Sequence, residues 1–536
     1  MPPLESLHAA IRDAAAAVAG GAVESVKLEQ PPRADLGDYS TNAPLLLAPR
    51  LGIGAHEVAG RLAGELEARL GGMLERAEVA GPGFLNLYLR DQWFVDALSH
   101  VLAEGERFGA ASLDPPARIN VEFVSANPTG PLHIGHARQA AYGDALARIL
   151  ELRGYDVTRE YYINDYGSQV VKLGESVRAL ARGEPVPAGG YHGDYVGRLV
   201  APERARELDL ETLAREACEA CLALIRESLE RFDVRFDVWF SERSLHDGPA
   251  VERVLEALAV RDETFTRDGA LWLRTTAHGD DKDRVLVRSS GDHTYFTSDI
   301  AYLEDKRERG FQRLVYVWGA DHHGYIARLK AVCAALGGDP DTLEIVIQQF
   351  VHLIGVEGRT AMSKREGEYV TLDELVEEIG VDASRFYLLQ RSHDTTVDLD
   401  LDLAVRQSAD NPVYYVQYAH ARIASVLAKA GDGRVQEALA QVAAAEPLHP
   451  SERALLKRLL AFPADLADAA ERRAPHRVAA YVLELAQDFT AFYRDCHVVG
   501  VEPRETESLR LALSVAARTT IVRALGLLGV SAPTQM

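Results

Sequence analysis

Two histidines that are separated by isoleucine and glycine occur in the run His133-Ile134-Gly135-His136. The run follows the breaker pair Gly130-Pro131 and precedes a segment of helical period, so we expect it to form a helix start. Free backbone N–H groups and the positive end of the helix dipole attract anions there, and imidazole groups add donors. A lone histidine at a helix start is often only a cap, but two in one turn predict a site that stabilises charge on a phosphate. Gly135 would let a nucleotide base approach the backbone.

A second candidate is Lys364 in the run Ala361-Met362-Ser363-Lys364-Arg365. The run precedes Thr371-Leu372-Asp373-Glu374, which is typical of a capping box at a helix start. The alternative for this segment alone is a solvated Lys-Arg turn. No G-x-x-x-x-G-K-[ST] loop occurs, so a P-loop cannot account for ATP binding.

The elements that must position the two histidines form a βαβ unit. We expect a strand at Ile119–Val124, a helix at His136–Arg153 that ends at Gly154, and a strand at Tyr155–Ile163. Such units build a doubly wound parallel sheet, so the predicted fold class is α/β with a Rossmann-like catalytic domain. The histidines then lie in the crevice at the carboxyl ends of the strands, where ligands bind.

Three domains are predicted along the chain. Residues 1–108 form an N-terminal α+β domain, with a helix at 7–18 and a strand at 84–89. Residues 117–404 form the α/β domain, in which a mostly helical insertion covers about 170–260 and strands resume at 313–318 and 343–353. Residues 405–536 form an all-α helical bundle, in which Asn411-Pro412 starts a helix with a capping side chain and proline in the first turn.

Composition narrows the class of protein. The chain has 536 residues, 47% of them hydrophobic and 26% charged, which suits a globular protein of several domains. Its formal charge of -22 argues against a protein that coats nucleic acid indiscriminately, although local basic patches could still bind a specific RNA. With four cysteines, a start unlike a signal peptide and no uninterrupted apolar stretch near 18 residues, a cytoplasmic protein without a membrane segment is predicted.

Cys218 and Cys221 form a C-x-x-C pair within a segment of helical period. No second pair of cysteines or histidines lies near it in the sequence, so a zinc or redox site is the less favoured interpretation. We expect two buried helical thiols, and no metal site formed by protein side chains.

Taken together, the motifs carry a family resemblance. His133 to His136 resembles the HIGH signature of class I aminoacyl-tRNA synthetases, and the run from Ala361 resembles their Lys-Met-Ser-Lys-Ser loop, with alanine and arginine at the first and last positions. Three further segments resemble the arginyl-tRNA synthetase family. They are the sequence from Val121 to Pro131, Gly319-Ala320-Asp321-His322-His323-Gly324, and the run from Asp410 to Arg422. The likeness extends from near residue 30 to Met536.

The resemblance implies specific roles for the residues of the α/β domain. His133 and His136 with Lys364 would be catalytic, with Lys364 as a clamp for the β and γ phosphates of ATP as pyrophosphate leaves. Gly135, Met362 and Ser363 would join them in binding ATP. The arginine-binding residues would be Glu122, Asn127, Tyr295 and Asp299. A planar guanidinium needs carboxylates placed for paired contacts, which lysine cannot satisfy. Taken in isolation, Glu122 could instead be a surface carboxylate on an edge strand, and Asp299 a helix N-cap.

The outer domains are implied to bind tRNA. Asn86 and Tyr88 alternate on the strand at 84–89, where they could meet an unstacked base of the tRNA elbow, although core packing of Tyr88 is an equal alternative. In the bundle, which resembles an anticodon-binding domain, Tyr414, Tyr418 and Arg422 could stack on anticodon bases. The alternative for most of these tyrosines is packing in the core of the bundle.

The implied activity is ATP-dependent joining of L-arginine to tRNA(Arg) through an adenylate, with Mg²⁺ and with a monomeric enzyme as the expected state. Three other classes stay open. A small nucleotidyltransferase with the same histidine signature would not need the outer domains, a non-catalytic paralogue should have lost pocket residues, and a synthetase for another amino acid should lack the paired carboxylates.

Overall fold

The computed structural model describes residues 2–354, 370–442 and 447–536. At its centre is a five-stranded, wholly parallel sheet with the strand order β12-β11-β5-β6-β7. The strands are β5 (Arg118–Phe123), β6 (Asp156–Ile163), β7 (Val238–Ser241), β11 (Arg313–Gly319) and β12 (Leu343–Gln348). The predicted α/β class and βαβ unit are confirmed, with α5 (Ile134–Leu152) joining β5 to β6 and Gly154 in the left-handed region at φ +88°.

The strand order reverses between β5 and β11. From β5 the chain builds outward through β6 and β7, and it later returns to the other side of β5 through β11 and β12. Helix α5 packs close to β5, because Gly143 lies where a Cβ would come within 2.2 Å of the Phe123 ring. A reversal of this kind opens a crevice between the carboxyl ends of the two strands.

Two expectations about strands were wrong. The insertion at 170–260 is mostly helical, as predicted, but the strands of the central sheet resume before 313, because β7 lies within the insertion and pairs with β6 at the edge of that sheet. Four residues are too few to show a strand period between helices. The predicted strand at 343–353 is two strands, because the chain turns at Gln349 and Phe350 toward His393 and Val397, and β13 (Val351–Ile354) pairs with β14 (Val397–Asp400) in a separate sheet.

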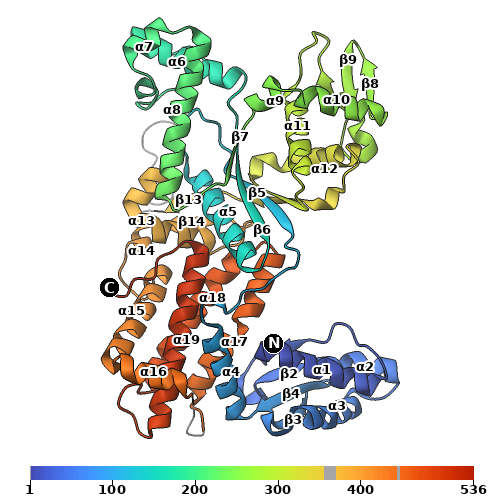
Figure 1. Ribbon diagram of the computed structural model, residues 1–536, viewed down its shortest axis with the longest axis vertical. Helices are drawn as coiled ribbons and strands as arrows, with labels where there is room; N and C mark the ends of the chain where they lie inside the picture. Colours follow the sequence, from blue (N-terminus) through green and yellow to red (C-terminus); the bar gives the residue numbers. More distant parts are fainter. Residues whose placement is uncertain (1, 355–369, 443–446) are drawn as a thin grey trace.

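Two appendages extend from the sheet on the side opposite the N-terminal domain (Figure 1). The first consists of α6 (Ser168–Arg182), α7 (Pro202–Glu207) and α8 (Leu210–Arg231). As expected, Cys218 and Cys221 are buried in α8 with free thiols. The second was not predicted as a sheet and contains α9 (Arg243–Asp247), α10 (Ala250–Val260), β8 (Thr264–Arg267), β9 (Ala270–Leu273), β10 (Arg284–Val287), α11 (Tyr295–Glu308) and α12 (Ile326–Ala335).

The N-terminal domain is an antiparallel sheet of order β1-β2-β4-β3 covered by helices. Its predicted strand at 84–89 coincides with β4, and its predicted helix at 7–18 lies within α1. The elements are α1 (Pro3–Ala19), β1 (Leu28–Glu29), β2 (Tyr39–Thr41), α2 (Ala43–Leu51), α3 (Ala55–Leu70), β3 (Leu74–Ala80), β4 (Phe84–Leu89) and α4 (Asp91–Glu104). Short 3₁₀ helices lie in connections along the whole chain, among them η6 (Ala320–Tyr325).

The C-terminal part is helical, as predicted, and packs beneath the central sheet (Figure 1). Its helices and those that lead into it are α13 (Leu372–Leu389), α14 (Leu401–Ala404), α15 (Pro412–Ala430), α16 (Asp432–Ala440), α17 (Pro450–Glu471), α18 (His476–Asp495) and α19 (Arg504–Leu528). Pro412 does begin α15, but the expected Asn411 cap is wrong. The Asn411 amide instead donates to the carbonyls of Ala404 and Arg406, at 2.9 Å each, and so fixes the preceding loop.

Among the described residues, α19 is the one helix with the length and hydropathy to cross a membrane. About 67% of its apolar window is buried inside the protein, where it contacts α15, α16, α17 and α18. Its apolar character therefore serves as the centre of the bundle.

Candidate functional site

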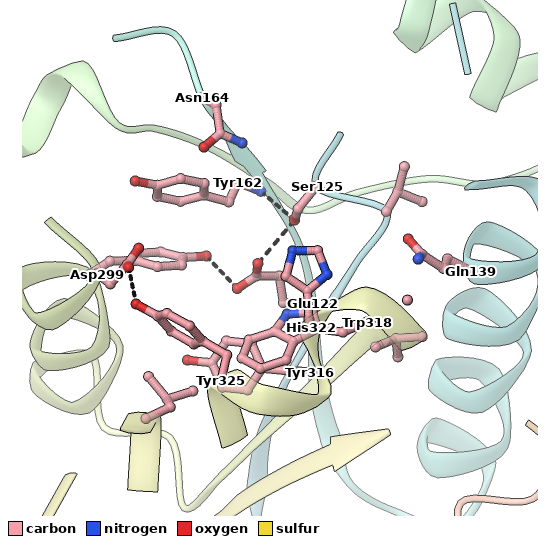
Figure 2. Close-up of a pocket in the computed structure, with 15 residues that line it drawn as sticks. Glu122, Ser125, Gln139, Tyr162, Asn164, Asp299, Tyr316, Trp318, His322 and Tyr325 are labelled. Carbon is pink, nitrogen blue, oxygen red and sulfur yellow. Dashed lines mark hydrogen bonds between the residues drawn. The ribbon is translucent and has the colours of Figure 1, made fainter. Parts of the chain in front are cut away.

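A cavity of about 290 Å³ opens at the strand reversal, between the carboxyl ends of β5 and β11. Figure 2 shows its carboxylates, aromatic rings and polar side chains converging from β5, β6, α11 and η6. The lining residues are Glu122, Val124, Ser125, Gln139, Tyr162, Asn164, Asp299, Tyr302, Tyr316, Val317, Trp318, Gly319, His322, Tyr325 and Leu329. The sequence-predicted residues Glu122 and Asp299 therefore share one pocket.

Glu122 lies on the middle strand of the sheet and is 6% exposed, so the edge-strand alternative was wrong. Its Oε2 accepts a hydrogen bond from Lys306 Nζ at 2.5 Å and from the Tyr302 hydroxyl at 3.0 Å. Its Oε1 accepts from Ser125 Oγ at 3.0 Å. Because Lys306 is fully buried beside it, the negative charge of Glu122 is already paired inside the protein.

A second buried carboxylate, Glu160, is paired in the same way. Arg309 donates to both of its oxygens at 2.7 and 2.9 Å, and Asn120 Nδ2 donates at 2.8 Å. These hydrogen bonds and the Lys306 charge hold the pKa of Glu160 below its usual range despite its burial. Behind the pocket, two anions are therefore matched by two cations.

Asp299 is the pocket carboxylate without a cationic hydrogen-bond partner among the described residues. It lies in the second turn of α11, whose N-cap residue is Thr294, so the N-cap alternative for Asp299 was wrong. The Tyr325 hydroxyl donates to its Oδ2 (Figure 2). Burial, with the nearby Glu122 charge, raises the pKa of Asp299 to about 6. A carboxylate in this state gains most from a ligand that brings its own positive charge.

Glu242 and Tyr162 were not among the residues predicted from the sequence. Glu242 is 3% exposed, directly after β7, and burial raises its pKa to about 7, helped by the charges of Asp299 and Asp165. The Tyr162 hydroxyl is buried without a hydrogen-bond partner in the described part of the chain, and Figure 2 places it on the Asp299 side of the pocket. The missed β7 concealed Glu242, since no helix period marks a residue that follows a four-residue strand.

The backbone between Glu122 and the histidines adopts an unusual conformation. Val124 has φ +67° and Ser125 has φ +39°, a region that β-branched residues rarely occupy. Ser125 Oγ compensates by donating to Glu122 and accepting from the Tyr162 N–H at 3.1 Å. Backbone strain of this kind persists where the surroundings enforce it, and it is concentrated at functional sites.

We call His133–His136 the histidine turn. The two imidazole rings stack with centroids 3.7 Å apart, and Nδ1 of each ring accepts a backbone N–H, from Gly135 to His133 at 3.0 Å and from His133 to His136 at 3.3 Å. Burial lowers the pKa of His133 and brings that of His136 to about 3. Both rings are therefore neutral near pH 7, with the proton on Nε2, and can serve as hydrogen-bond donors to a phosphate.

Lys364, Met362 and Ser363 lie outside the described residues, so their positions are not given by the structure. The segment that follows them begins beside the histidine turn. Ile134 N donates to Val370 O at 3.0 Å, and Leu372 N donates to Leu132 O at 2.7 Å. The Thr371 capping box is confirmed, with Glu374 N donating to Thr371 Oγ1 at 3.1 Å.

Asn127 and Tyr295 do not line the pocket. Asn127 is exposed in the loop before the histidine turn, where its carbonyl accepts from Thr129 N at 2.8 Å. Tyr295 is 57% exposed at the start of α11, with its hydroxyl 3.3 Å from Ser168 Oγ. Tyr295 and Asp299 do lie one helical turn apart on α11, as their spacing predicts.

The candidate RNA-binding residues differ in accessibility. Asn86 is only 5% exposed, whereas Tyr88 borders a cleft between β4 and α17 and carries Arg76 over its ring at 3.5 Å. On α15, Tyr414 and Tyr418 stack with centroids 5.9 Å apart, and Arg422 Nη2 donates to the Tyr418 hydroxyl at 2.7 Å. Because Tyr418 is 39% exposed, it lies on the surface of the bundle and not in its core.

Three family models match the chain along almost its whole length. The model of the arginyl tRNA synthetase N-terminal domain matches residues 5–89, that of the class I (R) tRNA synthetase catalytic domain matches 97–179 and 205–425, and that of the DALR anticodon binding domain matches 416–536. The arginine–tRNA ligase of Moorella thermoacetica is 46% identical over 99% of this chain and 98% of its own length. The chain belongs to the arginyl-tRNA synthetase family.

Other members of the arginyl-tRNA synthetase family agree with this placement. The arginine–tRNA ligase of Bacillus subtilis is 44% identical over 96% of this chain and 95% of its own length. The solved Thermus thermophilus arginyl-tRNA synthetase is 25% identical and superposes with a TM-score of 0.77 over 99% of this chain and all of its own. The pocket at the strand reversal therefore lies in the catalytic domain of a class I synthetase.

Proposed function

We propose that the pocket at the strand reversal binds L-arginine and that the chain uses ATP to join it to tRNA(Arg). The observation that carries the proposal is Asp299. Among the described pocket carboxylates, Glu122 is paired with Lys306, whereas Asp299 accepts a hydrogen bond from Tyr325 and from no cation, although the Arg328 charge lies near enough to act on it. A guanidinium can supply a cationic partner and donate to both carboxylate oxygens.

The same geometry favours arginine over lysine. A guanidinium presents several coplanar N–H donors, and the Asp299 carboxylate and the unpartnered Tyr162 hydroxyl offer acceptors on one side of the pocket. An ammonium is a compact point charge that would leave some of these acceptors unpaired, and a buried acceptor without a partner costs about 1–3 kcal/mol. We assign Glu242 a supporting role as the second negative charge near Asp299.

In the reaction we propose, the arginine carboxylate attacks the α-phosphate of ATP, and pyrophosphate leaves. A terminal ribose hydroxyl of the tRNA then takes the aminoacyl group from the adenylate. The neutral His133 and His136 rings donate through Nε2 to phosphate oxygens on which charge increases, and Lys364 holds the departing pyrophosphate. No protein nucleophile is needed, since positioning and electrostatic stabilisation supply most of the rate.

Mg²⁺ is proposed to enter with ATP. Among the described residues, no group of three or more His, Cys, Asp or Glu side chains could hold a metal ion. Mg²⁺ is commonly held through substrate phosphates and water with few protein ligands, so the residues present fit this manner of binding. When bound, the ion would neutralise charge on the phosphates.

For the tRNA, we propose that Tyr418 and Arg422 of α15 contact the anticodon arm, and that Tyr88 of the N-terminal domain contacts the elbow. The exposed Tyr418 ring, the half-buried Tyr88 ring and the guanidiniums adjacent to both support stacking on splayed bases. Asn127, Tyr295 and Asn86 remain proposed binding residues that would have to reach their ligands through a local rearrangement. We also propose domain limits near 108 and 404, a monomeric enzyme and a cytoplasmic location.

The experiment that tests the proposal is transfer of labelled arginine to total tRNA with ATP and Mg²⁺. Parallel reactions contain labelled lysine or lack ATP, and the variant Asp299→Asn serves as the pocket control. We expect label on tRNA only with arginine and ATP, and strongly reduced label with the variant. Charging with lysine would contradict the pocket assignment, whereas tRNA binding without any charging would favour the non-catalytic paralogue.

A further inference from the structure

A largely buried cluster of charged groups, none of which lines the pocket, joins the catalytic domain to the bundle. We call it the junction, and it consists of Asp144 and Arg148 on α5, Arg385 on α13, and the backbone carbonyls of Phe232, Asp233, Gly526 and Leu528. Arg385 is fully buried, and Asp144 is 2% exposed. The proposed chemistry uses neither residue.

Arg385 contacts three separate parts of the molecule through one guanidinium. Its Nη2 donates to Asp144 Oδ2, its Nε donates to Leu528 O at 2.8 Å, and its Nη1 donates to Phe232 O at 3.0 Å. The acceptors belong to the helix of the histidine turn, to the end of the bundle helix α19, and to the residue that follows the appendage helix α8. One planar group therefore sets the relative positions of three elements.

The backbone around the junction leaves room for the Arg385 guanidinium. Gly529 directly follows α19 with φ +67°, and a Cβ there would come within 2.3 Å of the Arg385 guanidinium. Helices α8 and α19, of 22 and 25 residues, both direct their C-terminal carbonyls here. Because the negative ends of two helix dipoles meet, cations are favoured at this point.

Arg148 repeats the connection at the edge of the junction. Its Nε donates to Asp144 Oδ2 at 2.8 Å, its Nη1 to Gly526 O at 3.2 Å, and its Nη2 to Asp233 Oδ2 at 2.9 Å. Its side chain is 28% exposed, so solvent screens these contacts more than those of Arg385. We therefore expect Arg148 to position α5 against the bundle as Arg385 does, but less strongly.

The α13 segment consists of two helical parts that meet at a kink at Gly380 (φ +79°), and the first part contacts the histidine turn. Its first residue, Leu372, donates to Leu132 O, and the preceding Val370 accepts from Ile134 N, as described above. Asp144 lies eight residues after His136, or about 12 Å along α5 at 1.5 Å per residue. The junction and the histidine turn are thus joined twice, through α5 and through α13.

We propose that Arg385 is a positioning residue, which holds the helix of the histidine turn at a fixed distance from the bundle so that a tRNA docked on the bundle presents its acceptor end at the pocket. This inference rests on the proposed function. A buried ion pair is often no more stabilising than a hydrophobic substitute, but the directional bonds of a guanidinium fix geometry. Lysine keeps the charge and loses the three-way contact.

The test compares Arg385→Lys, Arg148→Lys and Arg159→Lys in the full chain. Arg159 is the matched control, because it also lies near Asp144, at 3.7 Å, but pairs with Glu151 and makes no hydrogen bond or ion pair with α19 in the described part of the chain. We measure kcat for tRNA charging, KM for arginine and ATP, and tRNA affinity, at a temperature where unfolding curves show each variant folded. These readouts separate positioning from stability.

We expect Arg385→Lys to lower kcat for charging by roughly 10- to 100-fold while KM for arginine and ATP changes by less than about two-fold. Arg148→Lys should show a smaller fall of the same kind, and Arg159→Lys should match the wild type. An unchanged kcat for Arg385→Lys with a lowered Tm would overturn the proposal, since the residue would then be structural only. If Arg385→Lys does not fold, Arg148→Lys decides in the same way. A wild-type chain that charges no tRNA would instead contradict the proposed function.

Discussion

At the scale of single residues, the pocket is organised by which charges are already paired. Glu122 and Glu160 are matched by Lys306 and Arg309, and the remaining negative charge belongs to Asp299 and Glu242. Both free carboxyls have raised pKa values because burial penalises their charged forms. A cationic ligand reverses that penalty, so binding of arginine should depend on pH and should release protons.

Asp299→Asn should weaken arginine binding by about 100-fold, or ~3 kcal/mol, because a buried charge pair loses one partner. Since the pKa of Asp299 is raised to about 6, the wild type should lose arginine affinity as the pH falls through 6, and the variant should lose the part of the pH dependence that Asp299 contributes. Calorimetric titration over that pH range measures both effects. The exposed Asp292→Asn is the control, and a variant with wild-type affinity would exclude Asp299 as the guanidinium partner.

Glu242→Gln should reduce the number of protons released when arginine binds. In the free chain, Glu242 has a pKa of about 7 and faces Asp165, Asp299 and the neutral His246, so about half of the molecules carry it protonated near pH 7. A bound guanidinium favours the charged form and expels the proton. Calorimetry in two buffers of different ionisation enthalpy measures the release. The exposed Glu256→Gln should behave as wild type, and equal release by Glu242→Gln would show that Glu242 does not respond to the bound guanidinium.

Lys364→Ala should slow arginine activation by about 100-fold, because a positioned cation on the leaving pyrophosphate stabilises the transition state. KM for arginine should stay within about two-fold, since the guanidinium contacts are elsewhere. Pyrophosphate exchange at saturating arginine measures the rate constant. Arg365→Ala is the informative neighbour, and a larger loss with Arg365 than with Lys364 would transfer the role to the arginine.

At the scale of elements, the turn between β5 and α5 combines strain with close packing. Positive φ angles at Val124 and Ser125 lead into a helix start whose own N–H groups are accepted by the two histidines. The rings are thereby stacked, neutral and oriented before any ligand arrives. This preorganisation is what electrostatic stabilisation of a phosphate requires.

Gly135→Ala should reduce activation by roughly 10-fold or more with little change in stability. A Cβ at this position would lie 2.9 Å from the His133 ring, so the ring must shift and its Nδ1 contact with the backbone is lost. Pyrophosphate exchange and thermal unfolding, measured side by side, check the prediction. The matched substitution Gly324→Ala, where a Cβ would meet nothing within 4 Å, should be tolerated better. Equal effects of the two would contradict the packing argument.

At the scale of the whole molecule, the N-terminal domain is attached to the bundle by a small set of buried ions. Asp38, which is 4% exposed, accepts from Lys457 Nζ at 2.7 Å and from Arg453 Nη1 at 2.9 Å. Arg453 also pairs with Asp91 at the start of α4. The orientation of the proposed elbow-binding domain therefore depends on α17 of the bundle.

Asp38→Asn should destabilise the folded chain by about 2 kcal/mol, because it leaves two partly buried cations without their full counter-charge. It should also weaken tRNA affinity while the KM values for arginine and ATP stay unchanged, because the pocket is remote from this contact. Unfolding in denaturant and tRNA binding assays provide the measurements. Asp35→Asn removes an exposed ion pair and is the control. If Asp38→Asn is destabilised but binds tRNA as tightly as the wild type, the contact contributes to stability only.

Local patterns were sufficient for much of the fold. The strand at 84–89, the βαβ unit and the helices of the bundle follow from apolar period and from glycine and proline positions. Local patterns did not reveal three features: the four-residue β7, the separation of β12 from β13, and the sheet of β8, β9 and β10. Strands this short are defined by the strands they pair with. The Asn411 side chain likewise donates to the carbonyls of Ala404 and Arg406 and does not cap its own helix.

The sequence by itself determined the family and the parallel sheet, and it identified Glu122, Asp299 and the histidine turn as candidate site residues. These features depend on short motifs and local periods, which can be recognised in the sequence alone. Only the tertiary structure decided which charges are free. Lys306 neutralises Glu122 from 184 residues away, and Glu242 reaches the neighbourhood of Asp299 through the sheet edge. Charge pairing and desolvation depend on distances in space, which spacing in the sequence does not contain.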